Sequence, residues 1–308
     1  MKIPIFTDDP GWHGAQLKQA FAKRAVEAVF VSLQDCVIDL SCDKPCIQIP
    51  QCDTLPPAVF VRGVSGGTLQ QVITRLNVLH MLAMQGVLIY NDVKAIERTV
   101  DKAMTSFLLR SHGVSTPATW VCESKQHTAS IRQTATTHHQ TLVMKPLFGS
   151  QGLGVRKLHD HEQLPVPMQQ FVDGVYYFQQ LIETPMIAAE KKPHDYRVFV
   201  INNKVVAAMK RIGSSWVNNV AAGGRCEIAH QNEIMNTLAL KAAAAVNIAY
   251  CGVDIIQAAT GEYYVLEVNS IPAWKGLQSV LDLNSAQPNS VQINIAQLLV
   301  DDFLSKIS

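Results

Sequence analysis

The chain has 308 residues, which is enough for two or three domains with separate cores. Hydrophobic residues make up 48% and charged residues 17%, a balance that excludes a disordered chain and indicates a folded one. The formal net charge of +1 gives no basis for a nucleic acid or an anionic membrane as partner.

The first nine residues contain a short apolar run followed at once by acidic residues, which indicates a strand rather than a signal peptide. No apolar run is long enough to span a bilayer, so we expect a cytoplasmic protein. Seven cysteines occur without any Cys-x-x-Cys pair, which favours reduced thiols over a zinc site. The four that lie closest together are Cys36, Cys42, Cys46 and Cys52.

Short apolar runs alternate with amphipathic helical patterns over residues 1–91. Such alternation predicts a parallel sheet with helices on its faces. We expect an N-terminal α/β domain with strands at 3–6, 28–32, 58–61 and 87–90, and helices at 14–24 and 69–84.

A second unit is expected at residues 92–177. A helical pattern runs over 95–112, where Gly113 ends it, and strands at 119–121 and 142–144 enclose a surface helix within 126–140. Residues 147–155 contain three glycines, so their backbone N–H groups can approach phosphate oxygens closely. Their spacing matches neither the Rossmann fingerprint nor the P-loop, and a flexible turn is the alternative interpretation.

Residues 178–308 are rich in strand patterns, with one clear helix expected at 231–249. The predicted strands are 178–182, 196–201, 204–212, 252–257 and 263–268. The last two carry Asp254, Glu267 and Asn269, and the two-residue spacing of Glu267 and Asn269 places them on one face of a strand.

Two carboxylates and an amide on an apolar platform form the all-oxygen set that Mg²⁺ prefers. By the same alternation, Leu266 and Val268 are expected on the opposite face. The alternative is an antiparallel hairpin that keeps its charges on a solvated face.

Cationic side chains precede this acidic set along the chain. Lys145 ends an apolar strand just before the glycine-rich loop, where it can act as a point charge on phosphate. For Lys102, Arg197 and Arg211, a solvated surface charge is the alternative when each is taken alone.

Together these motifs resemble the ATP-grasp superfamily, and specifically the RimK-like group of amino-acid ligases. The resemblance runs in collinear order over nearly the whole chain. The matching segments are Arg62-Gly63, Asn91 with Ala95-Ile96, Asp101-Lys102, Gly113 through Thr119, Met144-Lys145-Pro146, Gly149 through Gly154, Asp195 through Val200, Ala207 through Arg211, Gly252-Val253-Asp254 and Glu267-Val268-Asn269.

This resemblance implies an ATP-grasp fold, in which a Rossmann-like pre-ATP-grasp domain of residues 1–91 precedes two α+β lobes that enclose ATP. Residues 92–177 would form the small lobe with the glycine-rich loop, and residues 178–308 the C-terminal lobe with the metal site. The implied reaction is ATP- and Mg²⁺-dependent: a carboxylate becomes an acyl phosphate, and an amine attacks it to give an amide, ADP and phosphate.

The resemblance also implies roles for single residues. Contacts with ATP would come from Lys102, Lys145, Ser150, Gln151, Gly152, Gln179, Gln180, Leu181, Ile182, Asp195 and Asn219, with Gln179 to Ile182 at adenine and Asp195 near the ribose. Two Mg²⁺ ions, or Mn²⁺ in their place, would be held by Asp254, Glu267 and Asn269. Charge developing during catalysis would be stabilised by Arg211 and Arg197.

Substrate contacts are expected from Trp12, His13, Arg62 and Asn218. Trp12 and His13 follow the first strand, at the edge where α/β sheets bind ligands, although a Trp packed for stability is the alternative. Val217 stands where the family usually has Arg, and this departure concerns the substrates more than ATP.

The function expected is addition of L-glutamate, through an α-peptide bond, to a small coenzyme-type acceptor such as a methanopterin- or folate-like one-carbon carrier. The alternatives are addition of another amino acid to a protein or carrier-protein tail, and a non-catalytic nucleotide-binding protein. A ligase of the D-alanine type is disfavoured by Asp195-Tyr196-Arg197. The partners expected are a small amino acid, a carboxylate acceptor and further copies of this chain.

Overall fold

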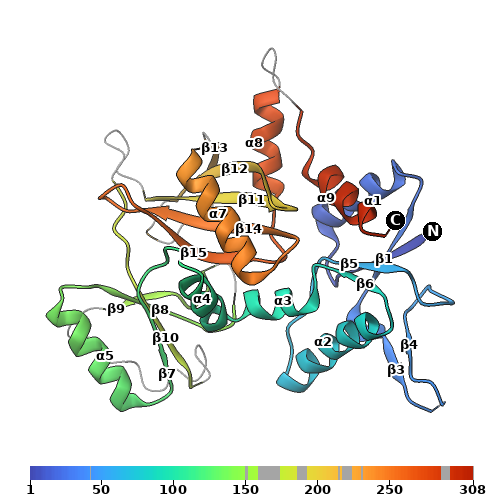
Figure 1. Cartoon of the computed structure of the whole chain (residues 1–308), viewed down its shortest axis with the longest axis horizontal. Helices are drawn as coiled ribbons and strands as arrows, with labels where there is room; N and C mark the ends of the chain where they lie inside the picture. Colours follow the sequence, from blue (N-terminus) through green and yellow to red (C-terminus); the bar gives the residue numbers. More distant parts are fainter. Residues whose placement is uncertain are drawn as a thin grey trace.

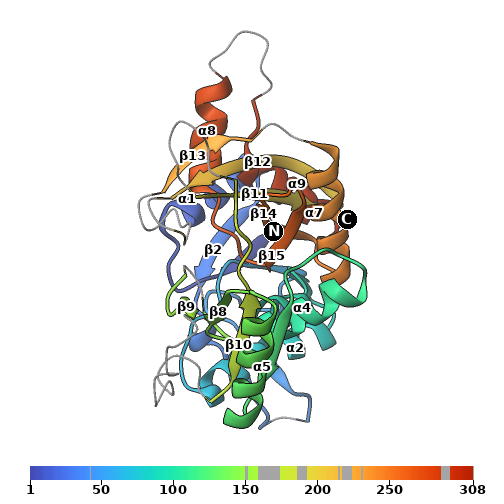
Figure 2. The same cartoon turned by 90° about the vertical axis from the view of Figure 1, so that its left-hand side faces the viewer.

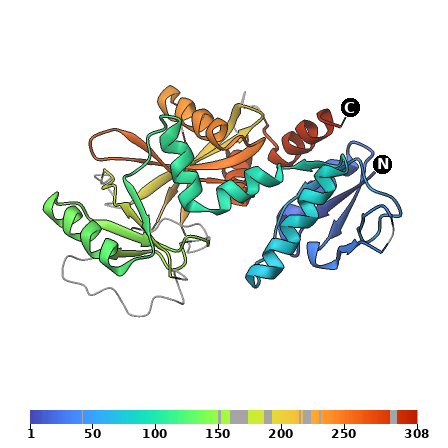
Figure 3. The ribbon, with the colours of Figure 1, turned by 60° about the horizontal axis from the view of Figure 1, so that its bottom comes forward.

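The computed structural model describes residues 1–41, 43–149, 152–158, 174–185, 193–213, 216, 224–229, 232–285 and 292–307. Three bodies are visible in Figure 1, and in Figure 2 the small lobe lies in front of the N-terminal domain. In Figure 3 the N-terminal domain and the small lobe lie at opposite ends, with a five-stranded sheet between them. No helix in the described part of the chain is long and apolar enough to cross a bilayer.

The N-terminal domain contains the predicted parallel sheet, in the strand order β2-β1-β5-β6. Its strands are β1 (Lys2–Phe6), β2 (Glu27–Val31), β5 (Ala58–Val61) and β6 (Leu88–Tyr90), and its helices are α1 (Gly11–Ala22) and α2 (Leu69–Met84). Helix α2 has the predicted bounds, because Thr68 and Gln71 form a capping box at its start. Sequence analysis missed the short elements η1 (Leu33–Asp35), β3 (Val37–Asp39) and β4 (Cys46–Gln48).

The expected helix over 95–112 is two helices, α3 (Val93–Val100) and α4 (Lys102–Ser111). Asp101 separates them, since its carboxylate accepts hydrogen bonds from the N–H groups of Ala103 and Met104 and so caps α4. Both helices pack against the C-terminal lobe, where Ala95 and Leu109 join its core. They therefore do not belong to the small-lobe sheet.

The small lobe is a four-stranded sheet in the order β7-β10-β8-β9, covered by α5. Its elements are β7 (Thr119–Cys122), α5 (Lys125–Thr137), β8 (Leu142–Lys145), β9 (Arg156–Leu158) and β10 (Tyr176–Gln180). The expected boundary between residues 177 and 178 falls inside β10, whose two neighbours are both strands of this lobe. The small lobe therefore extends to Gln180.

The C-terminal lobe is an antiparallel sheet in the order β13-β12-β11-β14-β15. Its strands are β11 (His194–Ile201), β12 (Lys204–Ile212), β13 (Arg225–Ile228), β14 (Tyr250–Gln257) and β15 (Tyr263–Asn269). The expected helix is α7 (Glu233–Val246), but it is not alone: α8 (Lys275–Ser285) and α9 (Ile295–Ser305) follow.

Alternate residues of the large sheet enter different cores. Val198 and Val253 pack with α7 on one face, while Phe199 and Ile201 pack on the other face in a core shared with the N-terminal domain. Helix α9 lies against α1 of the N-terminal domain and also contacts β11 of its own lobe (Figure 1). The sheet is therefore covered by α7 on one side and partly open on the other, between the small lobe and the N-terminal domain.

Candidate active site

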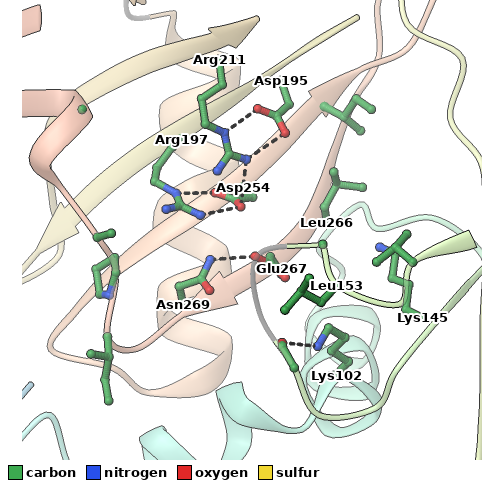
Figure 4. Close-up of a pocket in the computed structure, with 18 of the residues that line it drawn as sticks. Lys102, Lys145, Leu153, Asp195, Arg197, Arg211, Asp254, Leu266, Glu267 and Asn269 are labelled. Atoms are coloured by element: carbon green, nitrogen blue, oxygen red, sulfur yellow. Dashed lines mark hydrogen bonds and ion pairs between the residues drawn. The ribbon is translucent and has the colours of Figure 1, made fainter. Parts of the chain in front are cut away.

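The open face of the large sheet forms one wall of a cavity of about 540 Å³ (Figure 4). Strand alternation brings polar side chains from four neighbouring strands to this face. They are Asp195 and Arg197 from β11, Arg211 from β12, Asp254 from β14, and Glu267 and Asn269 from β15. The expected metal ligands and both expected catalytic arginines therefore lie together.

Asp254 is held by two arginines. Arg197 stands opposite it on β11 and donates from Nε and Nη2 to its two carboxylate oxygens at 2.7 and 2.8 Å. Arg211 Nη2 lies 2.9 Å from Asp254 Oδ2. Burial alone would raise the pKa of the Asp254 carboxyl, but the two guanidiniums outweigh burial and hold it well below its usual range. Asp254 is therefore an anion at neutral pH.

Asp195 is paired with Arg211, its cross-strand neighbour. Arg211 donates from Nε and Nη2 to the two Asp195 oxygens at 2.7 and 2.8 Å, and both side chains are buried. Each Asp195 oxygen accepts a hydrogen bond from Arg211 and keeps a lone pair for a further donor, so the expected contact with a ribose stays a prediction. Within the protein, Asp195 fixes the guanidinium of Arg211.

Glu267 and Asn269 lie side by side on β15, as their spacing predicts, with Asn269 Nδ2 donating to Glu267 Oε1 at 3.0 Å. The expectation for Leu266 is wrong, since this residue lines the cavity while Val268 is buried in the α7 core. The reason is a register shift between β14 and β15. Asp254 pairs with Glu267, and the next residue, Ile255, pairs with Val265, so that Leu266 has no partner on β14. The extra residue of this bulge turns Leu266 to the cavity.

The donor set suits a magnesium ion that shares its shell with phosphates and water. Within the described ranges, no group of three His, Cys, Asp or Glu side chains is placed to hold a metal without further ligands. Mg²⁺ in nucleotide sites takes only one or two carboxylates from the protein. Asn269 donates through its nitrogen, which leaves its amide oxygen as a possible ligand beside Glu267.

Two lysines reach the cavity from the other side (Figure 4). Lys145 ends β8 and donates to Gln179 Oε1 at 2.5 Å. Lys102 begins α4 and donates to the carbonyl oxygen of Gly149 at 2.8 Å, so it touches the glycine-rich loop. Burial lowers the pKa of Lys145 to about 8, although Glu267 acts in the opposite direction. Both lysines therefore face the acidic face of the sheet across the cavity.

The glycine-rich loop joins β8 to β9, as expected for a hairpin. Gly149 and Gly152 line the cavity with Leu153 and Val155. Gly152 has φ +70°, a left-handed conformation that favours glycine. Ser150 and Gln151, expected to contact ATP, lie outside the described residues, as do Asn218 and Asn219.

The segment expected to read adenine follows β10. The N–H groups of Gln180 and Leu181 donate to Ala118 O and Thr141 O, both at 2.8 Å. The Gln179 side chain bonds Lys145 and the hydroxyl of Tyr177. These groups are engaged within the protein, where the Gln179 side chain orients Lys145, and the expected adenine contact of the segment stays a prediction.

Trp12 and His13 do not line the cavity, in contrast to the expectation that they contact substrate. Trp12 packs against the core of the N-terminal domain. His13 Nε2 accepts the N–H groups of Trp274 and Lys275 at 3.1 and 3.2 Å, so it caps the start of α8. Burial lowers the pKa of His13 to about 4, with Arg62 and Lys275 acting in the same direction.

Arg62 does line the cavity, as expected, from the carboxyl end of β5. Sequence analysis missed the segment that follows β15 on the same wall: Ile271, Pro272, Ala273, Lys275 and Gly276. Its position directly after Asn269 is the signal that could have identified it. The cavity thus extends from the glycine-rich loop to the N-terminal domain.

A family model described as a RimK-like ATP-grasp domain matches residues 99–292. A tetrahydromethanopterin:alpha-L-glutamate ligase of Methanococcus maripaludis is 27% identical over 312 residues, covering 99% of this chain and 98% of that protein. The protein of the same name from Methanosarcina acetivorans is 30% identical over 264 residues, covering 75% and 77%. A probable alpha-L-glutamate ligase of Vibrio vulnificus is 27% identical, covering 93% of each chain.

Two solved structures show the same fold at low sequence identity. The ATP-grasp ligase PsnB, complexed with a minimal precursor, Mg and ADP, has a TM-score of 0.70 at 19% identity and covers 99% of this chain and 98% of its own. D-cycloserine synthetase DcsG has a TM-score of 0.71 at 15% identity, with full coverage of both chains. Because the family model spans more than half of the sequence, this chain belongs to the RimK-like ATP-grasp family of ATP-dependent carboxylate–amine ligases, as its motifs predict.

Proposed function

We propose that the chain joins the amino group of L-glutamate to a carboxylate of a small, pterin-type acceptor, with conversion of ATP to ADP and phosphate. Three relatives named tetrahydromethanopterin:alpha-L-glutamate ligase support this acceptor class, and the bacterial relatives carry the same amino acid in their names. The formal net charge of +1 also fits a small acceptor better than a strongly charged macromolecule.

The reaction takes place in two steps. An acceptor carboxylate oxygen attacks the γ-phosphorus of ATP, and ADP leaves with the electron pair of the broken P–O bond. The amine nitrogen of glutamate then attacks the acyl carbon, phosphate leaves with the electron pair of the broken C–O bond, and the nitrogen gives up one proton and keeps the other as the amide N–H. Both steps bring anions together, so positioning and neutralisation of charge supply most of the catalysis.

The observation that carries the proposal is the opposition of charges across the cavity. Lys102 and Lys145 lie on the small-lobe side, and the carboxylates of Asp254 and Glu267 lie on the large sheet. Phosphate groups between them would meet cations on one side and metal-binding oxygens on the other. We assign the two lysines to binding the phosphates. The glycine-rich loop, including Gly152, is assigned to covering the phosphates.

We assign Mg²⁺ to Glu267, Asn269 and Asp254, with two ions as the family resemblance implies or Mn²⁺ in their place. Bound metal neutralises the phosphate oxygens. Arg211 and Arg197 are held in fixed positions by Asp195 and Asp254, so their donors need little reorganisation when charge develops on the transferred phosphoryl group. In the segment after β10, we propose Ile182 as the residue that contacts adenine.

A release assay for ADP tests this function. Purified protein is given ATP, Mg²⁺, L-glutamate and tetrahydromethanopterin, and the acceptor is then analysed by mass spectrometry. We expect ADP release that requires both substrates, together with acceptor whose mass rises by one or more glutamate residues. ADP release without L-glutamate, or with no change in acceptor mass, would contradict the proposal.

Glu267→Gln is the matched test of the metal-binding role. It keeps the size of the side chain but removes its charge, so we expect ADP release to fall by about 100-fold or more. Glu262→Gln, an exposed glutamate just before the same strand, is the control and should keep the original rate. Equal rates for wild type and Glu267→Gln would refute the assignment.

A further inference from the structure

The cavity holds more positive than negative side chains. Among the described residues, six cationic side chains and three carboxylates line it. The cations are Arg62, Lys102, Lys145, Arg197, Arg211 and Lys275. Arg197 and Arg211 are paired with aspartates, and Lys102 and Lys145 are assigned to phosphates. In the part of the chain that the structure describes, no carboxylate forms an ion pair with Arg62 or Lys275.

Arg62 is fixed in place rather than free to move. Its backbone N–H donates to Phe6 O at 2.9 Å, and its guanidinium lies 5.1 Å from the centre of the Trp274 ring. Nη1 donates to Ile271 O at 3.3 Å. These contacts hold the planar group at the end of the cavity that the N-terminal domain forms.

The guanidinium is nevertheless poorly satisfied. Its Nε is fully buried and has no hydrogen-bond partner within the described residues. Arg62 as a whole is partly buried, and burial lowers the pKa of its guanidinium, although Tyr250 and Asp9 oppose this effect. A buried guanidinium with five N–H donors is costly unless an anion accepts from it. The free protein is therefore prepared to receive negative charge at this point.

The start of α8 adds a second attractive element at the same wall. Lys275 and Gly276 of its first turn line the cavity with Arg62. The first N–H groups of a helix lack partners within the helix and carry partial positive charge. His13 accepts those of Trp274 and Lys275, while Gln278 N–H bonds Trp274 O. Of the two first-turn residues that line the cavity, Lys275 already gives its N–H to His13, so Gly276 is the one left to offer a backbone donor.

We propose that Arg62, Lys275 and the first turn of α8 bind a substrate carboxylate that is not phosphorylated. The proposal rests on the ligase function proposed above and adds a recognition site to it. L-Glutamate carries two carboxylates that do not react, and the acceptor can carry others. A planar guanidinium donates two parallel hydrogen bonds to a carboxylate, which suits orientation of a substrate.

The position of the site favours a carboxylate over a nucleotide phosphate. Arg62 comes from the N-terminal domain, whereas Lys102 precedes the small-lobe sheet and Lys145 belongs to it, and these two bodies lie at opposite ends of the molecule (Figure 3). Ile271, which accepts from Arg62, follows the proposed metal ligand Asn269 by two residues. The site therefore adjoins the proposed metal site on the side away from the two lysines.

Calorimetry with separate substrates tests the site. Wild type, Arg62→Met and Lys275→Met are titrated with ADP plus Mg²⁺, and their ADP-loaded forms then with L-glutamate and with tetrahydromethanopterin. We expect Arg62→Met to weaken binding of one of the two substrates by about 30-fold or more and Lys275→Met by about 3-fold. ADP affinity should stay within about 2-fold in both variants. Lys241→Met removes an exposed lysine on α7 and is the matched control.

The substrate that Arg62→Met binds more weakly than wild type is the source of the carboxylate. A loss of affinity for L-glutamate or for tetrahydromethanopterin therefore supports the site. Unchanged affinity for both substrates in Arg62→Met would overturn it, as would a loss of ADP affinity alone. Thermal unfolding without ligand separates binding from folding: because an unpaired buried cation is removed, Arg62→Met should unfold at a temperature no lower than wild type. Failure of wild type to bind ADP with Mg²⁺ would instead overturn the proposed function.

Discussion

Lys145 carries its charge at a position where burial disfavours it. Its pKa is lowered to about 8, so the lysine is protonated below that pH and loses its charge as pH rises through it. Since phosphate binds the protonated form, we expect the dissociation constant of ATP to increase above about pH 8. Lys145→Arg, which stays charged, should flatten this pH profile. Calorimetric titrations from pH 7 to pH 9 measure the effect.

The size of the Lys145 contribution is measured by its removal. We expect Lys145→Ala to weaken ATP binding by about 10- to 100-fold, because a charge-assisted contact with phosphate is lost. Lys125→Ala, on the exposed first turn of α5 in the same lobe, is the control and should bind ATP as wild type does. Unchanged ATP affinity in Lys145→Ala would refute the phosphate assignment.

Single residues of the site were predictable where one strand determines them. Glu267 and Asn269 share a face because side chains alternate with a period of two, and that rule needs no partner strand. Leu266 violates the rule because the bulge depends on pairing with β14. Asp195 and Arg211 are neighbours because β11 pairs with β12 and a bulge between Phe199 and Val200 shifts the register, and no local pattern specifies that bulge.

Helix α8 depends at its start on an uncharged histidine. His13 Nε2 accepts two N–H groups of the first turn, which a protonated imidazole cannot do. Its pKa is about 4 in the folded protein and about 6.5 in an unfolded chain, so the unfolded state binds the proton first as pH falls. We expect the stability from this cap to be complete above about pH 6.5 and to be lost towards pH 4.

Replacement of His13 by glutamine tests the cap. The glutamine oxygen can accept an N–H group and does not titrate, so the unfolding temperature of His13→Gln should decline less than that of wild type between pH 6.5 and pH 4. His127→Gln, on exposed α5, is the control. Parallel curves for His13→Gln and wild type would show that His13 does not determine this pH dependence.

Helices and strands were predictable where the hydrophobic pattern in the sequence is long. They were not predictable where packing against the rest of the protein determines the element. The 16-residue helix α2 has a capping box and was predicted with the correct bounds. Strands β3, β4 and β9 have three residues each, too few for alternation to be recognised. The helical pattern runs through Asp101 without a break, so the division of α3 from α4 becomes visible only from the cap.

Asn91 joins the N-terminal domain to the large sheet. Its Nδ2 donates to Tyr250 O and Ser270 O, each at 2.8 Å, and its Oδ1 accepts Tyr250 N–H at 3.0 Å. All these groups are buried, so Asn91→Ala leaves backbone groups without partners and should lower the free energy of unfolding by about 2–5 kcal/mol. Urea denaturation measures this loss. Gln133→Ala, at an exposed position on α5, is the control and should unfold as wild type does. An unchanged free energy of unfolding in Asn91→Ala would show that this link does not stabilise the protein.

The order of the three bodies along the chain was predictable, but their connection was not. Alternating strands and helices indicated the N-terminal domain, and the collinear motifs indicated the lobes that follow. The return of α9 to α1 depends on aromatic packing, in which Phe303 contacts Phe21 and Phe60. These contacts join residues more than 240 positions apart, and no local pattern specifies them.

Because α9 packs on α1, the chain passes between the N-terminal domain and the lobes twice. Tyr90 donates to Asp302 at 2.6 Å, so the end of β6 and the last helix are bound to each other (Figure 1). The polypeptide therefore crosses from the N-terminal domain to the lobes before α3 and crosses back before α9. A protease that cuts at one crossing would leave the other covalently intact, and the nicked enzyme would migrate as a single particle until denaturant separated its fragments.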